Sequence, residues 1–206
     1  MDRVIQQSIT QILSPIYEKQ FSENSFGFRP KRGAHDALKQ CKRNVDDGYK
    51  YVVDMDLEKF FDTVCQSKLI EILSRTIKEG GVISLIHKYL NAGVVEKEMF
   101  AKTDVGVPQD GPLSPLLSNI MLNELDKELT KRGHRFVRYA DDCMIFVKSK
   151  KSANRTLNSI VTFIEKKLFL KVNKEKTKTA HYSKVKYLGY TFYRYKGSCR
   201  FRVHPK

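Results

Sequence analysis

The stretch FVRYADDCMIFV, residues 136–147, decides how the rest of the sequence is interpreted. Two apolar segments flank Ala140, Asp141 and Asp142, and this pattern predicts a β-hairpin whose turn holds both aspartates. Two adjacent carboxylates beside an apolar core repel each other, which costs free energy unless cations neutralise them. Adjacent aspartates are also ordinary turn formers, so this pair taken alone does not identify a function.

A second acidic segment lies earlier in the chain, at YVVDMDLEKFFD, residues 51–62. Its first seven residues alternate as in a β-strand, with Asp54 and Asp56 on one face and the apolar Val53 and Met55 on the other. If a sheet pairs this strand with the hairpin, Asp56 comes to lie beside Asp141. Such a grouping of carboxylates is what a two-metal phosphoryl-transfer site requires.

The remaining pattern mixes helices with short strands. Helical periodicity, capping residues and glycine stops predict helices over residues 1–20, 34–47, 67–80, 82–91, 114–133 and 152–168. Alternating segments predict strands near residues 178–182, 187–193 and 199–203. Because hairpins occur among the helices, we predict an α+β fold with an antiparallel sheet packed on helices, and not a doubly wound parallel sheet.

Charge is the most informative feature of the composition. The chain carries 38 Lys and Arg against 23 Asp and Glu, a formal net charge of +15. Residues 151–206 hold 15 of these basic residues and only two acidic ones, Glu165 and Glu175. A basic end on a nearly balanced body favours a polyanionic partner such as nucleic acid, whereas a solvated basic surface is the alternative.

Other features exclude several classes of protein. No apolar run approaches the ~20 residues of a membrane span, and the first residues are charged and polar where a signal peptide is apolar. We therefore expect an intracellular, cytoplasmic protein with no membrane partner. The four cysteines are widely spaced, which favours isolated reduced thiols over disulfides or a zinc site.

At the two acidic segments the sequence resembles the reverse transcriptases encoded by group II introns. Residues 139–142, YADD, match the YxDD box of that family, and residues 56–62 resemble its first catalytic block. Further blocks of the family match, in order, at residues 2–7, 27–30, 106–109, 112–119, 173–177 and 187–190. This many ordered matches in 206 residues make the resemblance specific.

The resemblance implies a fingers-and-palm fold. Residues 1–50 and 68–107 would form the fingers, and residues 51–67 and 108–206 the palm. It also implies that the first part of the fingers and a helical thumb are absent from these residues. The chain would then be a trimmed fragment that keeps the metal site and binds primer–template weakly.

The resemblance also assigns the reaction centre. The catalytic and metal-binding residues would be Asp56, Asp141 and Asp142, with the Leu57 carbonyl as a further ligand. They would hold two Mg²⁺ ions, or Mn²⁺ because carboxylates suit both. Phe61 matches the steric gate, whose ring occupies the space that a ribose 2′-hydroxyl needs.

Other positions would contact the nucleotide. Phe60 is expected to be a core aromatic beside the gate. Pro108 and Gln109 match the loop beneath the incoming nucleotide, although Asp110 stands where most relatives have glycine. Lys176 corresponds to a lysine near the nucleotide phosphates, with a solvated surface lysine as the alternative.

Two arginines of the fingers segment would bind nucleic acid. Arg29 and Arg32 are placed to contact the template or RNA backbone, since guanidinium groups suit phosphate. For Arg29 the alternative is structural, namely that it holds the turn at residues 26–30.

The implied function is RNA-directed DNA synthesis from deoxynucleoside triphosphates on an RNA template with a DNA primer, in a bacterial cytoplasm. The partner would be group II intron RNA, which the protein would also bind as a maturase. The alternatives are a splicing cofactor with little polymerase activity, and another bacterial lineage such as retron or diversity-generating enzymes. Phe61 disfavours an RNA-dependent RNA polymerase, and the three carboxylates favour retained polymerase chemistry.

Overall fold

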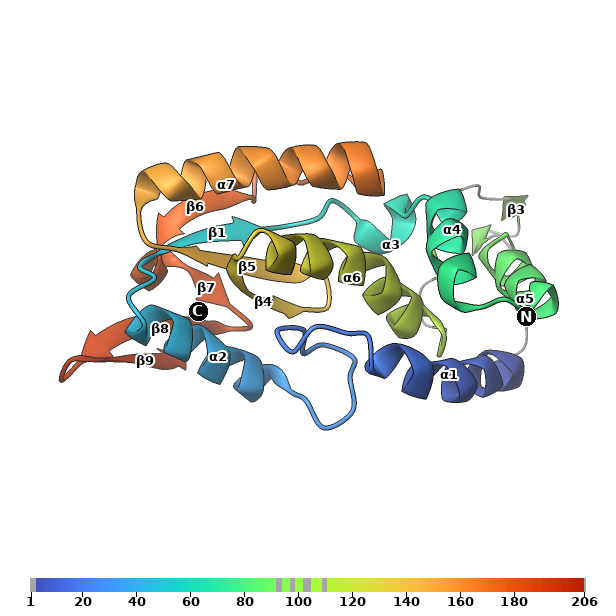
Figure 1. Cartoon of the computed structure of the whole chain (residues 1–206), viewed down its shortest axis with the longest axis horizontal. Coiled ribbons are helices and arrows are strands. Elements are labelled where there is room, and N and C mark those ends of the chain that lie inside the picture. Colours follow the sequence, from blue (N-terminus) through green and yellow to red (C-terminus); the bar gives the residue numbers. More distant parts are fainter. Residues whose placement is uncertain (1–2, 92–93, 97–98, 102–104, 109–110, 206) are drawn as a thin grey trace.

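A computed structural model describes residues 3–91, 94–96, 99–101, 105–108 and 111–205. Its centre is a four-stranded antiparallel sheet in the order β4–β5–β1–β6 (Figure 1). The strands are β4 (Arg135–Tyr139), β5 (Asp142–Val147), β1 (Tyr51–Met55) and β6 (Lys178–His181). The predicted hairpin and the predicted antiparallel α+β architecture are therefore both confirmed.

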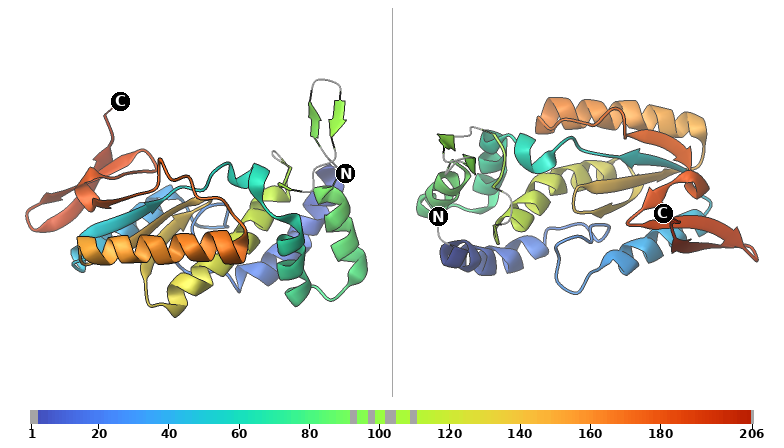
Figure 2. Two further views of the ribbon diagram at one scale, coloured as in Figure 1. Left: turned by 90° about the horizontal axis from the view of Figure 1, so that it is seen from above. Right: turned by 180° about the vertical axis from the view of Figure 1, so that it is seen from behind.

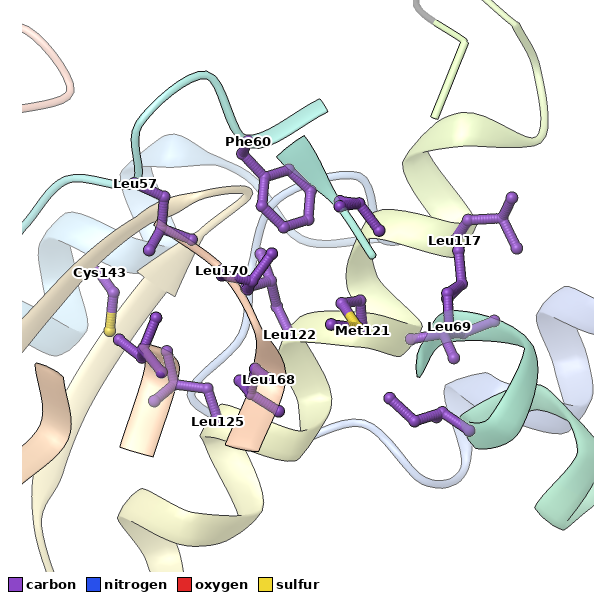
Figure 3. Close-up of a cluster of buried hydrophobic side chains, with 14 of the residues drawn as sticks. Leu57, Phe60, Leu69, Leu117, Met121, Leu122, Leu125, Cys143, Leu168 and Leu170 are labelled. Carbon is purple, nitrogen blue, oxygen red and sulfur yellow. The ribbon is translucent and has the colours of Figure 1, made fainter. Parts of the chain in front are cut away.

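One face of this sheet packs on two long helices, α6 (Ser114–Lys131) and α7 (Lys150–Phe163), the latter continuing as a π-helical turn, η1 (Ile164–Leu168). Figure 3 shows side chains of α6 packing with residues of neighbouring segments. These are Leu117, Met121, Leu122 and Leu125 from α6 with Leu57, Cys143, Leu168 and Leu170. The apolar stripe predicted for residues 114–133 is the buried face of α6.

The other face packs on α2 (Ala34–Asp46) and a second, three-stranded sheet. That sheet consists of β7 (Lys186–Tyr187), β8 (Tyr190–Tyr195) and β9 (Ser198–Val203), and a 3-10 turn, η2 (Tyr182–Lys184), precedes it. Successive strand residues point to opposite faces. Accordingly Val52 and Met144 belong to this second core, while Val53 and Ile145 belong to the first.

The remaining helices gather at one end of the molecule (Figures 1 and 2). They are α1 (Arg3–Glu18), α4 (Gln66–Thr76) and α5 (Gly80–Leu90), and the short α3 (Phe60–Thr63) joins them to β1. The hairpin of β2 (Val94–Glu96) and β3 (Met99–Ala101) projects from this end. Within the described residues no helix is long and apolar enough to cross a membrane.

Several local predictions need correction. The helix expected to run to Gly80 ends at Thr76, and Gly80 instead begins α5. Ser114 does not cap α6, because its hydroxyl lies 2.7 Å from the Tyr89 hydroxyl, with which it shares a hydrogen bond. In α1 the predicted apolar stripe is only partly buried: Leu13 is 4% exposed, whereas Ile12 is 67% exposed.

A buried ion pair joins β4 to α6. Arg138 and Asp126 are both fully buried. The Arg138 guanidinium donates from Nε and Nη2 to the two Asp126 carboxylate oxygens at 2.8 and 2.7 Å. It also donates from Nη1 to Asn119 Oδ1 at 2.9 Å and to the Ala140 carbonyl at 2.8 Å. The pair therefore fixes the end of the β4–β5 hairpin to the helix beneath it.

The same network includes the loop at Gly27. Asn119 Nδ2 donates to the Gly27 carbonyl at 2.9 Å, and the Phe26 amide donates to the Arg138 carbonyl at 2.9 Å. A Cβ atom on Gly27 would lie 2.3 Å from the Ala140 nitrogen. Only glycine leaves room for the hairpin at this position, which explains the glycine in the 26–30 turn.

We expect Asp126→Asn to lower the free energy of unfolding by about 3–5 kcal/mol, because the Arg138 charge would remain buried without its partner. Urea unfolding followed by far-ultraviolet circular dichroism measures this change. The matched control is Asp47→Asn, which breaks the exposed Arg135–Asp47 pair (2.8 Å) and should cost less than about 1 kcal/mol. Equal losses in the two variants would contradict the role given to the buried pair.

Candidate active site

The three predicted catalytic carboxylates stand at the ends of neighbouring strands. Met55 of β1 pairs with Cys143 of β5, so one further step of this register sets Asp56 opposite Asp142. Asp141 lies in the two-residue turn that follows Tyr139, beside Ala140, whose φ is 54°. The sequence prediction placed Asp56 beside Asp141, and this register brings Asp142 to the same end of the sheet as well.

A cleft of about 760 Å³ opens at this edge of the sheet. Three of the four predicted metal-site residues, Asp56, Leu57 and Asp141, line it. The segment 171–176, which includes Lys176, also lines it. Within the described residues, no three Asp, Glu, His or Cys side chains are grouped closely enough to hold a metal ion as they lie. Asp56 and Asp141 thus border the cleft as separate side chains.

The carboxylates influence one another's protonation. Burial raises the pKa of Asp142, and the charges of Asp141 and Asp56 raise it further. Burial also raises the pKa of Asp54 to about 6, Lys178 opposes that rise, and Asp142 and Asp56 add to it. These mutual effects show that the carboxylates share one region, where a cation would be stabilised.

Two lysines of the C-terminal segment face these carboxylates. Lys176 Nζ stands 4.0 Å from Asp56 Oδ2, and Lys178 Nζ stands 4.0 Å from Asp54 Oδ2. Lys178 and Asp54 are also register partners of β6 and β1. At 4.0 Å, and with the Lys176 side chain 70% exposed, these contacts neutralise the carboxylates only partly.

The block at residues 173–177 positions Asp56 and Lys176. Asn173 Oδ1 accepts hydrogen bonds from the backbone amides of Glu175 and Lys176, both at 3.2 Å, which makes an Asx turn. The Asn173 amide donates to the Asp56 carbonyl at 2.9 Å, and the Asp56 amide donates to Thr177 Oγ1 at 3.1 Å. Residues more than a hundred positions apart are thereby held in one place.

The two phenylalanines after β1 differ in burial. Phe60 is 2% exposed and lies in the core, which confirms the prediction of a core aromatic. Phe61 is half-buried, with its ring centroid 5.3 Å from that of Phe60 in an edge-to-face contact. The Val107 amide donates to the Phe61 carbonyl at 2.6 Å, so residues 105–108 lie directly against α3.

The predicted nucleotide loop is described only in part. The Pro108 carbonyl accepts hydrogen bonds from the Tyr89 hydroxyl at 3.4 Å and from Ser114 Oγ. These bonds tie Pro108 to α5 and α6. Gln109, like Asp110, lies outside the described residues.

The two predicted nucleic-acid-binding arginines differ in exposure. The Arg29 side chain is 2% exposed and pairs with Glu18 at 2.6 Å. It also donates to the Ser22 and Ser25 carbonyls at 2.5 and 2.8 Å. These contacts support the structural alternative, and they leave Arg29 almost no surface for nucleic acid. Arg32 is 20% exposed and pairs with Glu23.

Sequence reasoning missed the residues that support the site. Arg138, Asp126 and Asn119 hold the hairpin from below, and Thr177 holds Asp56. An arginine inside the otherwise apolar run of residues 136–147 was the available signal. A charge in such a run must be exposed at an edge or paired inside the core.

Comparison with known proteins places this site in a family. The model of the family described as Reverse transcriptase (RNA-dependent DNA polymerase) matches residues 1–192. The chain is 31% identical over 218 residues to Protein YkfC of Escherichia coli K12, covering 87% of this chain and 57% of that protein. It is 32% identical over 254 residues to Group II intron-encoded protein LtrA of Lactococcus lactis, covering 92% of this chain and 42% of that protein.

The chain therefore spans about half the length of these curated relatives. Among solved structures it resembles apo telomerase from Candida tropicalis, with a TM-score of 0.69 and 16% identity. That likeness covers 92% of this chain and 39% of the telomerase chain, and it concerns the fold alone. The family match over nearly the whole chain, with the resemblance to group II intron-encoded members, shows that this chain belongs to the reverse transcriptase (RNA-dependent DNA polymerase) family.

Proposed function

We propose that this chain is the catalytic part of a group II intron-encoded reverse transcriptase. Its reaction is RNA-directed DNA synthesis, in which the 3′-hydroxyl of a DNA primer attacks a deoxynucleoside triphosphate and pyrophosphate leaves. One observation carries the proposal. Asp56 directly follows β1, Asp142 begins the neighbouring strand β5, and Asp56 and Asp141 line the same cleft of about 760 Å³.

The donor set fits divalent metal ions, which reverse transcriptases use. Carboxylate oxygens suit Mg²⁺, and Mn²⁺ takes the same donors. Burial raises the pKa of Asp142, and the charges of Asp141 and Asp56 raise it further; a cation among these three carboxylates would offset both effects. We propose that these residues, with the Leu57 carbonyl, hold two Mg²⁺ ions. When bound, such ions make the attacking hydroxyl more acidic and stabilise charge on the phosphates.

The chain's other residues would orient the substrate. Lys176, which lines the cleft together with Asp141, would present an exposed ammonium to the triphosphate. The half-buried ring of Phe61, braced by Phe60, would exclude a ribose 2′-hydroxyl. Pro108 and Gln109 would support the incoming nucleotide from below. Arg32 keeps enough exposed surface to contact the nucleic-acid backbone.

We propose the corresponding division into two lobes. Residues 1–50 and 68–107 would be the fingers, and residues 51–67 and 108–206 the palm. The helices α1, α4 and α5 lie together at the fingers end (Figure 1). Helix α2 falls within the proposed fingers segment but packs on the palm sheet through the second core.

A maturase role would accompany synthesis. The observation that favours it is the charge of residues 151–206, which contain 15 basic residues and only two acidic ones. Such charge supplies affinity for a structured RNA without reading its sequence. We propose group II intron RNA as the partner, because LtrA is named as a group II intron-encoded protein.

Primer extension on an RNA template tests the polymerase proposal. The assay uses this chain and any longer natural polypeptide that contains it. We expect Asp141→Ala to reduce deoxynucleotide incorporation about a thousandfold, since loss of a metal ligand removes several kcal/mol of transition-state stabilisation. Asp47→Ala, at an exposed aspartate that pairs with Arg135 and does not line the cleft, should leave the rate unchanged. Chelation of divalent ions should abolish synthesis.

The result that contradicts polymerase activity is equally specific. Absence of metal-dependent DNA synthesis from every polypeptide that contains residues 1–206 would remove the proposal. If such an inactive polypeptide still bound a group II intron RNA tightly and promoted its splicing, the maturase role would be the function that remains.

Phe61→Ala tests the assignment of the steric gate. We expect the preference for deoxy- over ribonucleotides, measured as a ratio of kcat/KM values, to fall by about a hundredfold, because a shape-based pocket discriminates only through the group that fills it. Phe163→Ala is the matched control, since Phe163 is likewise half-buried but lies on α7. An unchanged preference in Phe61→Ala would show that another side chain excludes the 2′-hydroxyl.

A further inference from the structure

The β8–β9 hairpin presents a face of alternating aromatic and basic side chains, which we call the Tyr–Arg face: Thr191, Tyr193 and Tyr195 on β8, and Arg200 and Arg202 on β9. The side chains on the opposite face of the hairpin include Phe192 and Cys199, which are buried in the second core. Because side chains alternate along a strand, the Tyr–Arg face points away from that core. Figure 2 shows this hairpin at the end of the molecule opposite the β2–β3 hairpin.

We propose that the Tyr–Arg face binds single-stranded RNA, at a site separate from the polymerase cleft. Two cross-strand contacts define it. The Arg200 guanidinium lies over the Tyr195 ring, and the Arg202 guanidinium lies over the Tyr193 ring, each at 5.5 Å from the ring centroid. In the register Tyr193 is directly opposite Arg200, so each arginine reaches the diagonal tyrosine.

Charge complementarity selects a polyanion as the occupant. The sequence contains no Asp or Glu after Glu175, while residues 176–206 hold nine Lys and Arg. Arg200 and Arg202 form no ion pair within the described part of the chain. A cation–π contact holds a guanidinium without neutralising it, so both positive charges remain available to phosphates.

The aromatic half of the face selects unpaired nucleotides. Tyr195 is 51% exposed, and bases of a single strand stack on exposed aromatic rings of basic surfaces. A base that stacks on Tyr195 would displace the Arg200 guanidinium or the Lys196 ammonium, both of which lie over this ring. Guanidinium forks match phosphate oxygens. The hydroxyls of Thr191, Tyr193 and Tyr195 on the same face can pair with ribose 2′-hydroxyls, which distinguish RNA from DNA.

A charged edge strand has a simpler explanation, because basic residues on an edge prevent strand-to-strand aggregation. β9 is such an edge. That explanation accounts for Arg200 and Arg202, but it does not require two partly exposed tyrosines arranged beneath them. It also predicts that the tyrosines contribute nothing to RNA binding, which makes the two explanations separable.

The hairpin is fixed in place before any ligand arrives. The Cys199 amide donates to Asp46 Oδ1 at 2.6 Å, and Lys42 Nζ donates to Ser198 Oγ at 3.0 Å. Both contacts come from the last turns of α2. With Phe192 2% exposed and Cys199 1% exposed, the Tyr–Arg face is a rigid surface, which reduces the entropy lost on binding.

Fluorescence anisotropy with a labelled oligouridylate of about 12 nucleotides, within the site sizes of single-strand-binding proteins, tests the proposal. The complete 206-residue chain is titrated into the labelled RNA at several salt concentrations, in a buffer that contains EDTA and no nucleoside triphosphates. We expect Tyr193→Ala/Tyr195→Ala to raise Kd about 10- to 100-fold with the salt dependence unchanged. We expect Arg200→Ala/Arg202→Ala to reduce the slope of log K against log salt by about 1.4.

Matched variants separate the face from general charge and from misfolding. Lys150→Ala/Lys151→Ala removes the same charge from exposed positions at the start of α7, and it should leave the salt slope within error of the parent chain. Tyr193→Phe/Tyr195→Phe keeps both rings and should lose much less affinity than the alanine pair. Circular dichroism confirms that each variant is folded.

Two results would overturn the proposal: unchanged RNA affinity in the folded tyrosine-to-alanine variant, or equal effects of the lysine and arginine pairs. Oligothymidylate binding as tightly as oligouridylate would overturn the assignment to RNA. Because the titration contains no divalent metal ion and no nucleoside triphosphate, it is independent of polymerase activity. Asp141→Ala, which removes synthesis in the proposed function, should bind the oligouridylate like the parent chain.

Discussion

The buried ion pair between Arg138 and Asp126 is the constraint on which the rest of the structure depends. Burying two charges costs several kcal/mol each unless geometry and further hydrogen bonds compensate, and here four hydrogen bonds from Arg138 do so. The pair joins the sheet to α6 from inside the core. It also holds the Ala140 carbonyl, and therefore the strained turn in which Ala140 has a φ of 54°. A left-handed alanine costs roughly 1–2 kcal/mol, and the network stabilises it at the base of Asp141.

A second set of hydrogen bonds, from Asn173 and Thr177, supports Asp56 at the cleft. An Asx turn at Asn173 and the Thr177 hydroxyl clamp the backbone of Asp56, so the end of β1 is held by a segment far along the chain. The turn also sets Lys176 in front of Asp56 at 4.0 Å. One network thus orients the hairpin that carries Asp141, and another orients the strand that carries Asp56. The cleft that Asp56 and Asp141 line is therefore supported by two separate networks, which suits a site whose side chains must not move when charged ligands enter.

Most of the architecture could be predicted because periodicity reports burial. The stripe of Leu117, Met121 and Leu125 matched a buried face of α6. The apolar segments around Asp141 and Asp142 became β4 and β5, which are buried on both faces of the sheet. Individual contacts could not be predicted, because they depend on what the fold brings together. Ser114 looks like a helix cap but bonds to Tyr89, and Arg29 looks like a phosphate ligand but is enclosed by Glu18 and two carbonyls.

Charge is distributed so that the chain does not neutralise its own acidic cleft. A chain with a net charge of +15 could place lysines in close ion pairs with every carboxylate of the site. Instead Lys176 and Lys178 stand at 4.0 Å and remain more than half exposed, and the basic residues of the β8–β9 hairpin lie over tyrosine rings. Burial and then the charges of Asp141 and Asp56 raise the pKa of Asp142, Lys176 opposes that rise, and an added cation would relieve the repulsion that is left. The guanidinium groups keep charge that an added polyanion can neutralise. An acidic site and a basic site can coexist in one small chain because neither is fully neutralised by the other, so each can bind a ligand of opposite charge. The β8–β9 hairpin and the cleft are also supported by separate contacts.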